Sequence, residues 1–211
     1  MDIEYKGANC ITLSTKQATV AVDPNVALVG LKNPTGKMTV QVATQEEFAV
    51  EPEAGVLKVS GPGEYELEAG VSIVGIAAQR HIDTTNDGKK ATVYRVEIGD
   101  ISVAVVGHIT GQLSGTQLEA LGVIDVLVVP VGNSGYTLDA HEAIAIVRQV
   151  DPKVIIPTHY ADDAAKYEVP QAELEPFLKE LGATHETVAK LKLKAGQLPE
   201  TLTVYEITRT S

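Results

Sequence analysis

The stretch from residue 126 to residue 160 reads VLVVPVGNSGYTLDAHEAIAIVRQVDPKVIIPTHY, and it decides the fold class. It opens with the apolar run Val126 to Val131, which is typical of a fully buried strand. Apolar residues then recur at helical spacing from Asp139 to Val150, and Glu142 stands at capping-box spacing from the first residue of this run. A second buried strand is predicted for Lys153 to Pro157. A strand, a helix and a strand in this order predict an α/β protein.

The pattern differs between the two halves of the chain. Before residue 100, strand-like runs are joined by clusters of Gly, Pro and Asn, which favours a meandering antiparallel sheet. After residue 100, strands alternate with helices predicted at Ser114 to Leu121 and Gln171 to Leu181. No linker separates the halves, so we expect a single domain over residues 1–211, with both halves sharing one core. The remaining predicted strands are Ala18 to Val22, Met38 to Val42, Gly55 to Val59, Val71 to Ala78, Thr92 to Val96, Ile101 to Gly107 and Leu202 to Ile207.

The composition excludes several classes of protein. The 211 residues contain 17 Lys and Arg against 28 Asp and Glu, a net charge of −11, so binding to nucleic acid or to an anionic membrane is not expected. With 44% hydrophobic residues the chain can bury a core. The single cysteine, Cys10, excludes an internal disulfide. Neither a signal peptide nor an apolar run of membrane-spanning length is seen, so we expect a soluble, cytoplasmic protein.

Polar residues of chemical interest stand where predicted strands end. Asp23 follows the strand ending at Val22, while His108 and His159 follow the strands ending near residues 107 and 158. His81 and Asp83 come after the strand that ends at Ala78. Ligands in layered α/β proteins bind beyond strand ends, and imidazole is the commonest metal ligand. If these strands are neighbours, the three histidines would converge.

Several segments resemble, in the same order, motifs of one known enzyme family. On these segments, which span roughly residues 1 to 180, the chain resembles the metallo-β-lactamase superfamily. It is most similar to the branch of small metal-dependent hydrolases that includes the ascorbate-6-phosphate lactonase type. The matching segments are Gly7-Ala8-Asn9-Cys10, Val22-Asp23-Pro24, Gly61-Pro62-Gly63-Glu64-Tyr65, His81-Ile82-Asp83, Gly107-His108, Val129-Pro130-Val131-Gly132, Tyr136-Thr137-Leu138-Asp139-Ala140 and Ile156-Pro157-Thr158-His159-Tyr160.

The resemblance implies a four-layer αββα sandwich, with helices outside and two sheets inside. It also implies one or two divalent metals, commonly zinc, that generate a hydroxide nucleophile. The family takes its ligands from a His-x-His-x-Asp-His loop, a later His, a bridging Asp and a final His. In this chain the loop position reads Ala43-Thr44-Gln45-Glu46-Glu47-Phe48, and no histidine precedes His81. The bridging Asp position is His108, so only His81 and His159 match ligand positions directly.

Three interpretations follow from this departure. The first is a degenerate, non-catalytic member that binds a small molecule or a partner. The second is a reduced metal-dependent hydrolase, in which His81, His108 and His159 hold one divalent metal, zinc or manganese, and Asp23 or Asp83 orients a ligand or acts as a base. The third is metal-free acid–base chemistry by His108 with Asp83. An exposed strand edge that pairs with a second copy would give a homo-oligomer.

Overall fold

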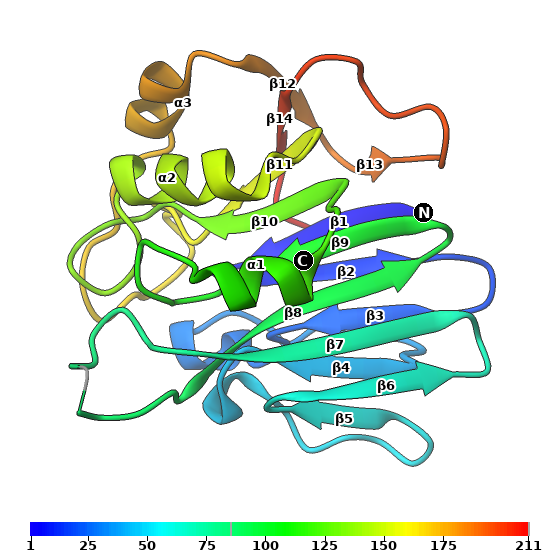
Figure 1. The fold of residues 1–211 in the computed structure, drawn as a ribbon. Coiled ribbons are helices and arrows are strands. Elements are labelled where there is room, and N and C mark those ends of the chain that lie inside the picture. The colour runs from blue at the N-terminus through cyan, green and yellow to red at the C-terminus, as the bar shows by residue number, and fades with distance from the viewer. Residues whose placement is uncertain (85, 211) are drawn as a thin grey trace.

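The computed structural model describes residues 1–84 and 86–210, and in them two β-sheets lie face to face (Figure 1). The first sheet has six strands in the order β13-β1-β2-β3-β4-β5. Its strands β1, β2 and β3 pair antiparallel, whereas β3, β4 and β5 run parallel. These strands are β1 (Asp2–Gly7), β2 (Cys10–Ser14), β3 (Thr19–Val22), β4 (Val40–Ala43), β5 (Leu57–Ser60) and β13 (Leu191–Lys192).

The second sheet has eight strands in the order β12-β14-β11-β10-β9-β8-β7-β6. Strands β6 to β9 form an antiparallel meander, and β9, β10, β11, β14 and β12 run parallel to one another. Because parallel strands end at the same edge of a sheet, the residues after β9, β10 and β11 come together. The strands are β6 (Gly63–Leu67), β7 (Val71–Ala78), β8 (Ala91–Ile98), β9 (Ile101–Val105), β10 (Val126–Pro130), β11 (Val154–Thr158), β12 (Thr184–Val188) and β14 (Thr203–Ile207).

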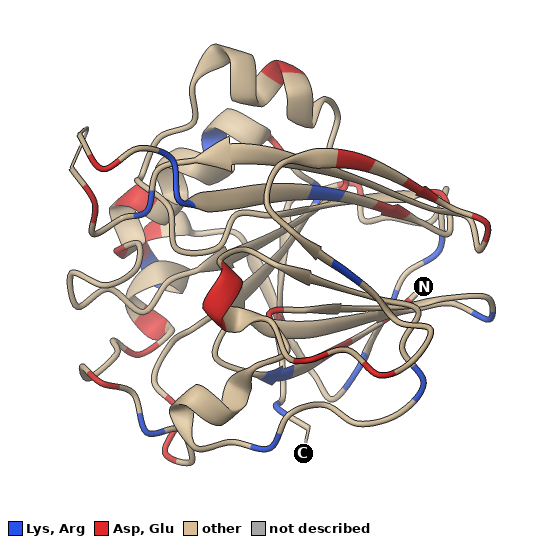
Figure 2. Cartoon of the chain, turned by 90° about the horizontal axis from the view of Figure 1, so that it is seen from below, with Lys and Arg blue, Asp and Glu red and all other residues tan. Residues whose placement is uncertain are grey.

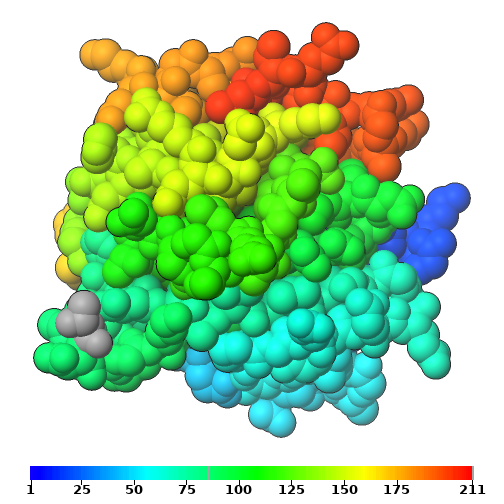
Figure 3. All heavy atoms as spheres, viewed as in Figure 1, coloured from blue at the N-terminus to red at the C-terminus, as the bar shows by residue number. Residues whose placement is uncertain are grey.

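The α-helices of the described residues pack against the eight-stranded sheet. In Figure 3 the green, yellow and orange segments that carry them cover much of the visible face. The predicted capping box is present, since the Glu142 backbone N–H donates to the Asp139 carboxylate at 2.8 Å and the Asp139 N–H donates to the Glu142 carboxylate at 3.1 Å. The helices are α1 (Gly115–Leu121), α2 (Ala140–Val150) and α3 (Glu175–Leu181).

Branched apolar side chains fill the space between the two sheets. Ile3 near the start of the chain and Ile207 near its end belong to the same buried cluster, which also contains Val20 from the first sheet and Val126 from the second. A second apolar layer lies between the eight-stranded sheet and the helices and includes Phe177. The composition, rich in Val, Ile and Leu and poor in aromatic residues, therefore supplies two layers of core.

Two of the predicted elements need correction. The antiparallel meander predicted for the first hundred residues is present in β1 to β3 and in β6 to β8. In contrast, β3, β4 and β5 run parallel, because long connections return the chain to the same sheet edge each time. The helix predicted to start at Gln171 starts at Glu175 instead. Residues before it are held in extended form, since Ala172 donates its backbone N–H to the Gly132 carbonyl at 2.6 Å.

The predicted α/β sandwich of two facing sheets with flanking helices is confirmed. Before Gly115 the described residues contain two 3₁₀ helices, η1 (Val26–Val29) and η2 (Glu46–Phe48), and no α-helix. The three α-helices of the described residues thus all pack against the eight-stranded sheet. Charged positions lie mainly in surface loops and at exposed strand positions, with acidic ones the more frequent (Figure 2). Across residues 1–84 and 86–210, no helix has both the length and the apolar character that a membrane span requires.

Candidate ligand-binding site

A cavity of about 210 Å³ lies beyond the ends of β3, β9 and β11. The turns η1 and η2 and the loop that follows β11 complete its wall. Two of the predicted metal ligands and one predicted catalytic residue line it. The lining residues are Ala8, Asn9, Asp23, Asn25, Val26, Leu28, Val29, Glu47, Phe48, His108, Tyr136, His159, Tyr167, Glu168, Val169 and Gln171.

His108 is buried among rings. Its imidazole lies with its centroid 4.5 Å from that of His159, 5.2 Å from that of Phe48 and 5.1 Å from that of Tyr136. Its side chain is enclosed, with only 4% of the residue exposed, and neither ring nitrogen has a hydrogen-bond partner in the described part of the chain. Burial, with smaller contributions from His159 and His81, lowers the pKa of His108 well below its usual range, so the ring is neutral at pH 7.

His159 is held in place by its backbone as well as by its side chain. It adopts a left-handed conformation (φ 51°) directly after β11, and its N–H donates to the Ala8 carbonyl at 2.7 Å. A Cβ on Gly132 would lie 1.9 Å from the His159 carbonyl oxygen, so only glycine fits there. The ring Nδ1 lies 3.2 Å from Gln171 Oε1. Burial lowers the pKa of His159 to about 4, which the bond to Gln171 only partly offsets.

Asp23 is the centre of a fully paired polar network. Its carboxylate accepts hydrogen bonds from Asn9 Nδ2, from the Thr44 backbone N–H and from Thr44 Oγ1, each at 2.7 Å. Asn9 Oδ1 in turn accepts from Thr158 Oγ1 at 2.6 Å. Burial raises the pKa of Asp23 to about 6, against the opposing effect of these bonds. The network ties the ends of β3, β4 and β11 together across both sheets.

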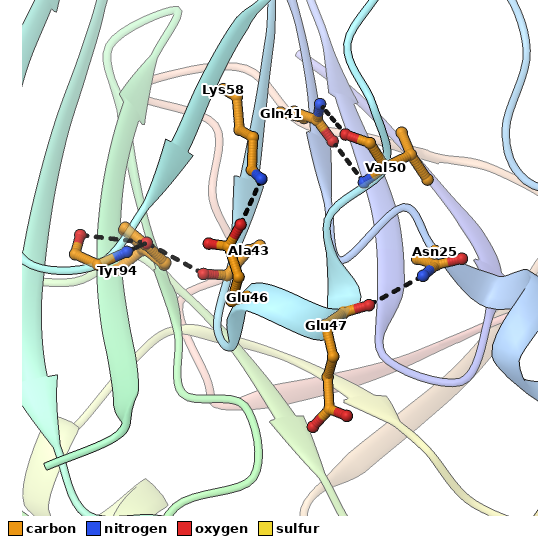
Figure 4. Close-up of polar contacts among 9 residues, drawn as sticks. Asn25, Gln41, Ala43, Glu46, Glu47, Val50, Lys58 and Tyr94 are labelled. Atoms are coloured by element: carbon orange, nitrogen blue, oxygen red, sulfur yellow. Dashed lines mark hydrogen bonds and ion pairs between the residues drawn. The ribbon is translucent and has the colours of Figure 1, made fainter.

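Residues 43–48, at the position where the resemblance led us to expect a ligand loop, lie in a well-connected turn. Gln41 makes two hydrogen bonds with the Val50 backbone, at 2.8 and 3.1 Å, and Lys58 pairs with Glu46 (Figure 4). Asn25 Nδ2 donates to the Glu47 carbonyl at 2.8 Å, whereas the Glu47 carboxylate points away from these contacts. Phe48, the last residue of this turn, lies edge to face against His108.

The predicted ligand His81 and the predicted base Asp83 lie outside this cavity. His81 approaches His108 through its backbone, with its N–H donating to the His108 carbonyl at 3.1 Å, while its Nδ1 lies 3.9 Å from the Glu142 carboxylate. Both carboxylate oxygens of Asp83 accept from the Arg80 guanidinium, at 2.7 and 2.8 Å. The structure therefore brings His108, His159 and Asp23 to one cavity, whereas His81 lines a smaller neighbouring cavity with His108, and Asp83 pairs with Arg80.

The residues present do not fit the metal site that the family implies. Within the described ranges, no group of three or more His, Cys, Asp or Glu side chains is placed to hold a metal ion. Protein zinc sites use at least three such ligands, whereas His108 and His159 provide two adjacent imidazoles. The assignment of His81, His108 and His159 to one metal remains a prediction.

Sequence reasoning missed the aromatic wall of the cavity. Phe48, Tyr136 and Tyr167 all line it, and the Tyr167 ring centroid lies 4.8 Å from that of His159. These residues come from three separate loops, and a lone aromatic residue in a loop has no distinctive sequence pattern. Gln171 was missed because it was assigned to a helix, whereas its side chain fixes the ring of His159.

Comparison with known proteins shows the family. A family model described as the beta-lactamase superfamily domain matches residues 2–159, so the chain belongs to this superfamily, as its motifs predicted. No curated protein sequence matches the chain.

Solved structures support the same fold. A candidate Zn-dependent hydrolase of the metallo-beta-lactamase superfamily from Thermotoga maritima matches with a TM-score of 0.76 at 26% identity, over 99% of this chain and 100% of that chain. The metallo hydrolase Igni18 from Ignicoccus hospitalis matches with a TM-score of 0.65 at 16% identity, over 99% and 94%. A candidate metal-dependent hydrolase from Parabacteroides distasonis matches with a TM-score of 0.63 at 16% identity, over 85% and 87%. Similar structures are thus named as metal-dependent hydrolases.

Proposed function

We propose that this chain is a ligand-binding member of the metallo-β-lactamase superfamily that binds a small molecule without the family's metal. The observation that carries the proposal is the contact of Phe48 with His108, edge to face with ring centroids 5.2 Å apart. The turn that delivers Phe48 replaces the loop from which the family takes several of its ligands. With an apolar ring at this point, residues 1–84 and 86–210 place no third metal ligand beside His108 and His159.

The cavity supports a binding role. Its volume of about 210 Å³ suits a compact small molecule. Apolar and aromatic side chains form much of the wall, and a few polar groups fix direction, as in small-molecule sites generally. Asp23 and Asn9, which are hydrogen-bonded to each other, form part of the polar wall.

A reduced metal-dependent hydrolase is the second candidate. It is favoured by the adjacent rings of His108 and His159, whose centroids are 4.5 Å apart, and by the names of the similar structures, which include a Zn-dependent and a metal-dependent hydrolase. In this reading a single zinc or manganese ion would use these two rings, and His81 would turn away from Glu142 to supply a third.

Metal analysis separates the two candidates. The protein is purified without chelator, incubated with excess zinc or manganese, desalted, and assayed for bound metal by mass spectrometry. The proposal predicts far less than one metal per chain, and the same value for His108→Ala and His159→Ala. About one metal per chain, lost in both variants, would overturn the proposal in favour of the hydrolase. Glu186→Ala, a change on the exposed edge strand β12, is the matched control.

A further inference from the structure

The charged and aromatic groups of the cavity favour a ligand of positive charge. Among the described residues that line it, three are acidic, Asp23, Glu47 and Glu168, and none is Lys or Arg. Burial raises the pKa of Tyr136, the carboxylates of Glu47 and Glu168 raise it further, and the Arg80 guanidinium opposes them with a smaller effect. The net charge of −11 adds to this field. An anionic guest would be repelled and a cationic one attracted.

The hydrogen-bonding groups of the cavity also favour such a ligand. The three side-chain amides that line it each donate within the protein: Asn9 to Asp23, Asn25 to the Glu47 carbonyl, and Gln171 to the Val169 carbonyl at 2.9 Å. Besides the Tyr167 hydroxyl, which has no partner in residues 1–84 and 86–210 and can donate or accept, the unpaired groups there are mainly acceptors. Asn25 Oδ1 and the carboxylates of Glu47 and Glu168 have no donor among the contacts of residues 1–84 and 86–210. Such a lining suits a guest that carries N–H donors.

The buried ring of His108 is a second, independent observation that points to a ligand. It is 4% exposed, lines the cavity and leaves both ring nitrogens without a partner in the described chain. One nitrogen of a neutral imidazole is a hydrogen-bond acceptor. The faces of Tyr136 and Tyr167 nearby attract positive charge through their ring quadrupoles. Aromatic faces, acidic groups and an unpaired acceptor thus surround one small volume.

We propose that the ligand of this cavity is a small organic ammonium ion, a primary amine in its protonated form. The inference rests on the proposed function, because it names the class of molecule that the metal-free cavity binds. The ammonium N–H groups would donate to the free acceptors, and its charge would face the Tyr136 and Tyr167 rings. The carbon skeleton would contact Val26, Leu28 and Val169, which line the same cavity.

Three probes of nearly one shape test this inference. Isopentylamine, isopentanol and isocaproate share a branched skeleton and carry a cation, a neutral group and an anion. Each is titrated into the protein in buffer that contains a chelator, and binding is followed by shifts in amide NMR spectra. We expect isopentylamine to bind at least about ten-fold more tightly than isopentanol, because charge and ring attraction act together. Isocaproate is expected to bind most weakly.

Variants of the cavity residues test whether isopentylamine binds in this cavity. Glu47→Gln and Glu168→Gln should each weaken isopentylamine binding about two- to five-fold and leave isopentanol unchanged, since an exposed charge contributes modestly. Tyr136→Leu should weaken isopentylamine several-fold more than isopentanol. Glu200→Gln, which changes the same charge outside the cavity, should alter neither. Amide spectra of each variant without ligand verify that it is folded.

The possible outcomes separate this inference from the proposed function. Equal binding of isopentylamine and isopentanol, tighter binding of isocaproate, or no binding of isopentylamine at millimolar concentrations would overturn the ammonium ligand and leave the metal-free site standing. Binding of the amine that is insensitive to Glu47, Glu168 and Tyr136 would also overturn it. One tightly bound zinc per chain in the metal assay would instead overturn the proposed function.

Discussion

Two polar groups line the same cavity, are buried to the same extent and differ in how they are paired. Asp23 and His108 are each 4% exposed. The Asp23 carboxylate accepts three hydrogen bonds from Asn9 and Thr44, whereas the His108 ring has no partner in the described chain. An unpaired buried polar group costs about 1–3 kcal/mol. The pairing of Asp23 therefore indicates that its carboxylate stabilises the fold, whereas the unpaired imidazole of His108 carries this cost within the described chain.

The largest change in the free energy of unfolding is expected from replacing Asp23, the paired group of the two. Asp23→Ala removes the acceptor of three hydrogen bonds and leaves donors of Asn9 and Thr44 buried without a partner. We expect the free energy of unfolding to fall by about 3 kcal/mol or more. Urea unfolding followed by circular dichroism measures it, with Glu186→Ala as a surface control expected to stay within about 0.5 kcal/mol. A loss below about 1 kcal/mol for Asp23→Ala would contradict the structural role.

The same comparison shows what the sequence could predict of the fold. The segment from β10 to β11 was predicted to within a residue or two, because its apolar runs, helical spacing and capping box all agree. Strands β1 and β2 were not predicted from pattern, since Gly7-Ala8-Asn9-Cys10 between them was interpreted only as a motif. The direction of β4 and β5 was wrong because pairing depends on long connections that leave no local signal.

The site was predictable only where it depends on strand order. His108 and His159 come together because β9, β10 and β11 are adjacent and parallel, which the alternation of strands and helices indicated. The direction of the His81 side chain could not be foreseen, since it lies in a turn and is set by Glu142 on α2. The contact of Phe48 with His108 depends on tertiary packing of a 3₁₀ turn, so no spacing rule predicts it.

The second prediction concerns how the stability contributions of two buried groups, His159 and Asp23, change with pH. The pKa of buried His159 is lowered to about 4 from an ordinary value of 6.5, so the unfolded chain binds more protons between these values. Stability from this residue is fully present above pH 6.5 and is lost as the pH falls toward 4. Asp23, with its pKa raised to about 6, has the opposite slope, since its contribution is greatest below about pH 4 and declines as the pH rises through 6.

The contribution of His159 is obtained by comparing the free energy of unfolding of the wild type with that of the variant His159→Asn. His159→Asn keeps a residue that tolerates the left-handed backbone (φ 51°), and Asp23 is common to both proteins. We expect the stability of the wild type relative to this variant to fall by about 3 kcal/mol between pH 6.5 and pH 4, the free-energy equivalent of the pKa shift. Urea unfolding at several pH values gives the curve. Parallel curves for the two proteins would show that His159 is not buried in its neutral form.

The smallest change in the free energy of unfolding is expected from replacing His108, the unpaired group. This change should be opposite in sign to that of Asp23→Ala. His108→Leu replaces the imidazole with an apolar side chain of similar size against Phe48 and Tyr136. Because the described chain makes no hydrogen bond to this ring, none is lost, and the cost of burying two unpaired nitrogens is removed. We expect the free energy of unfolding in ligand-free buffer to be unchanged or to rise by up to about 2 kcal/mol. A loss of more than about 1 kcal/mol would mean that His108 supports the fold, and the contrast with Asp23 would fail. A gain in stability together with weaker isopentylamine binding would place the role of His108 in the ligand rather than in the fold.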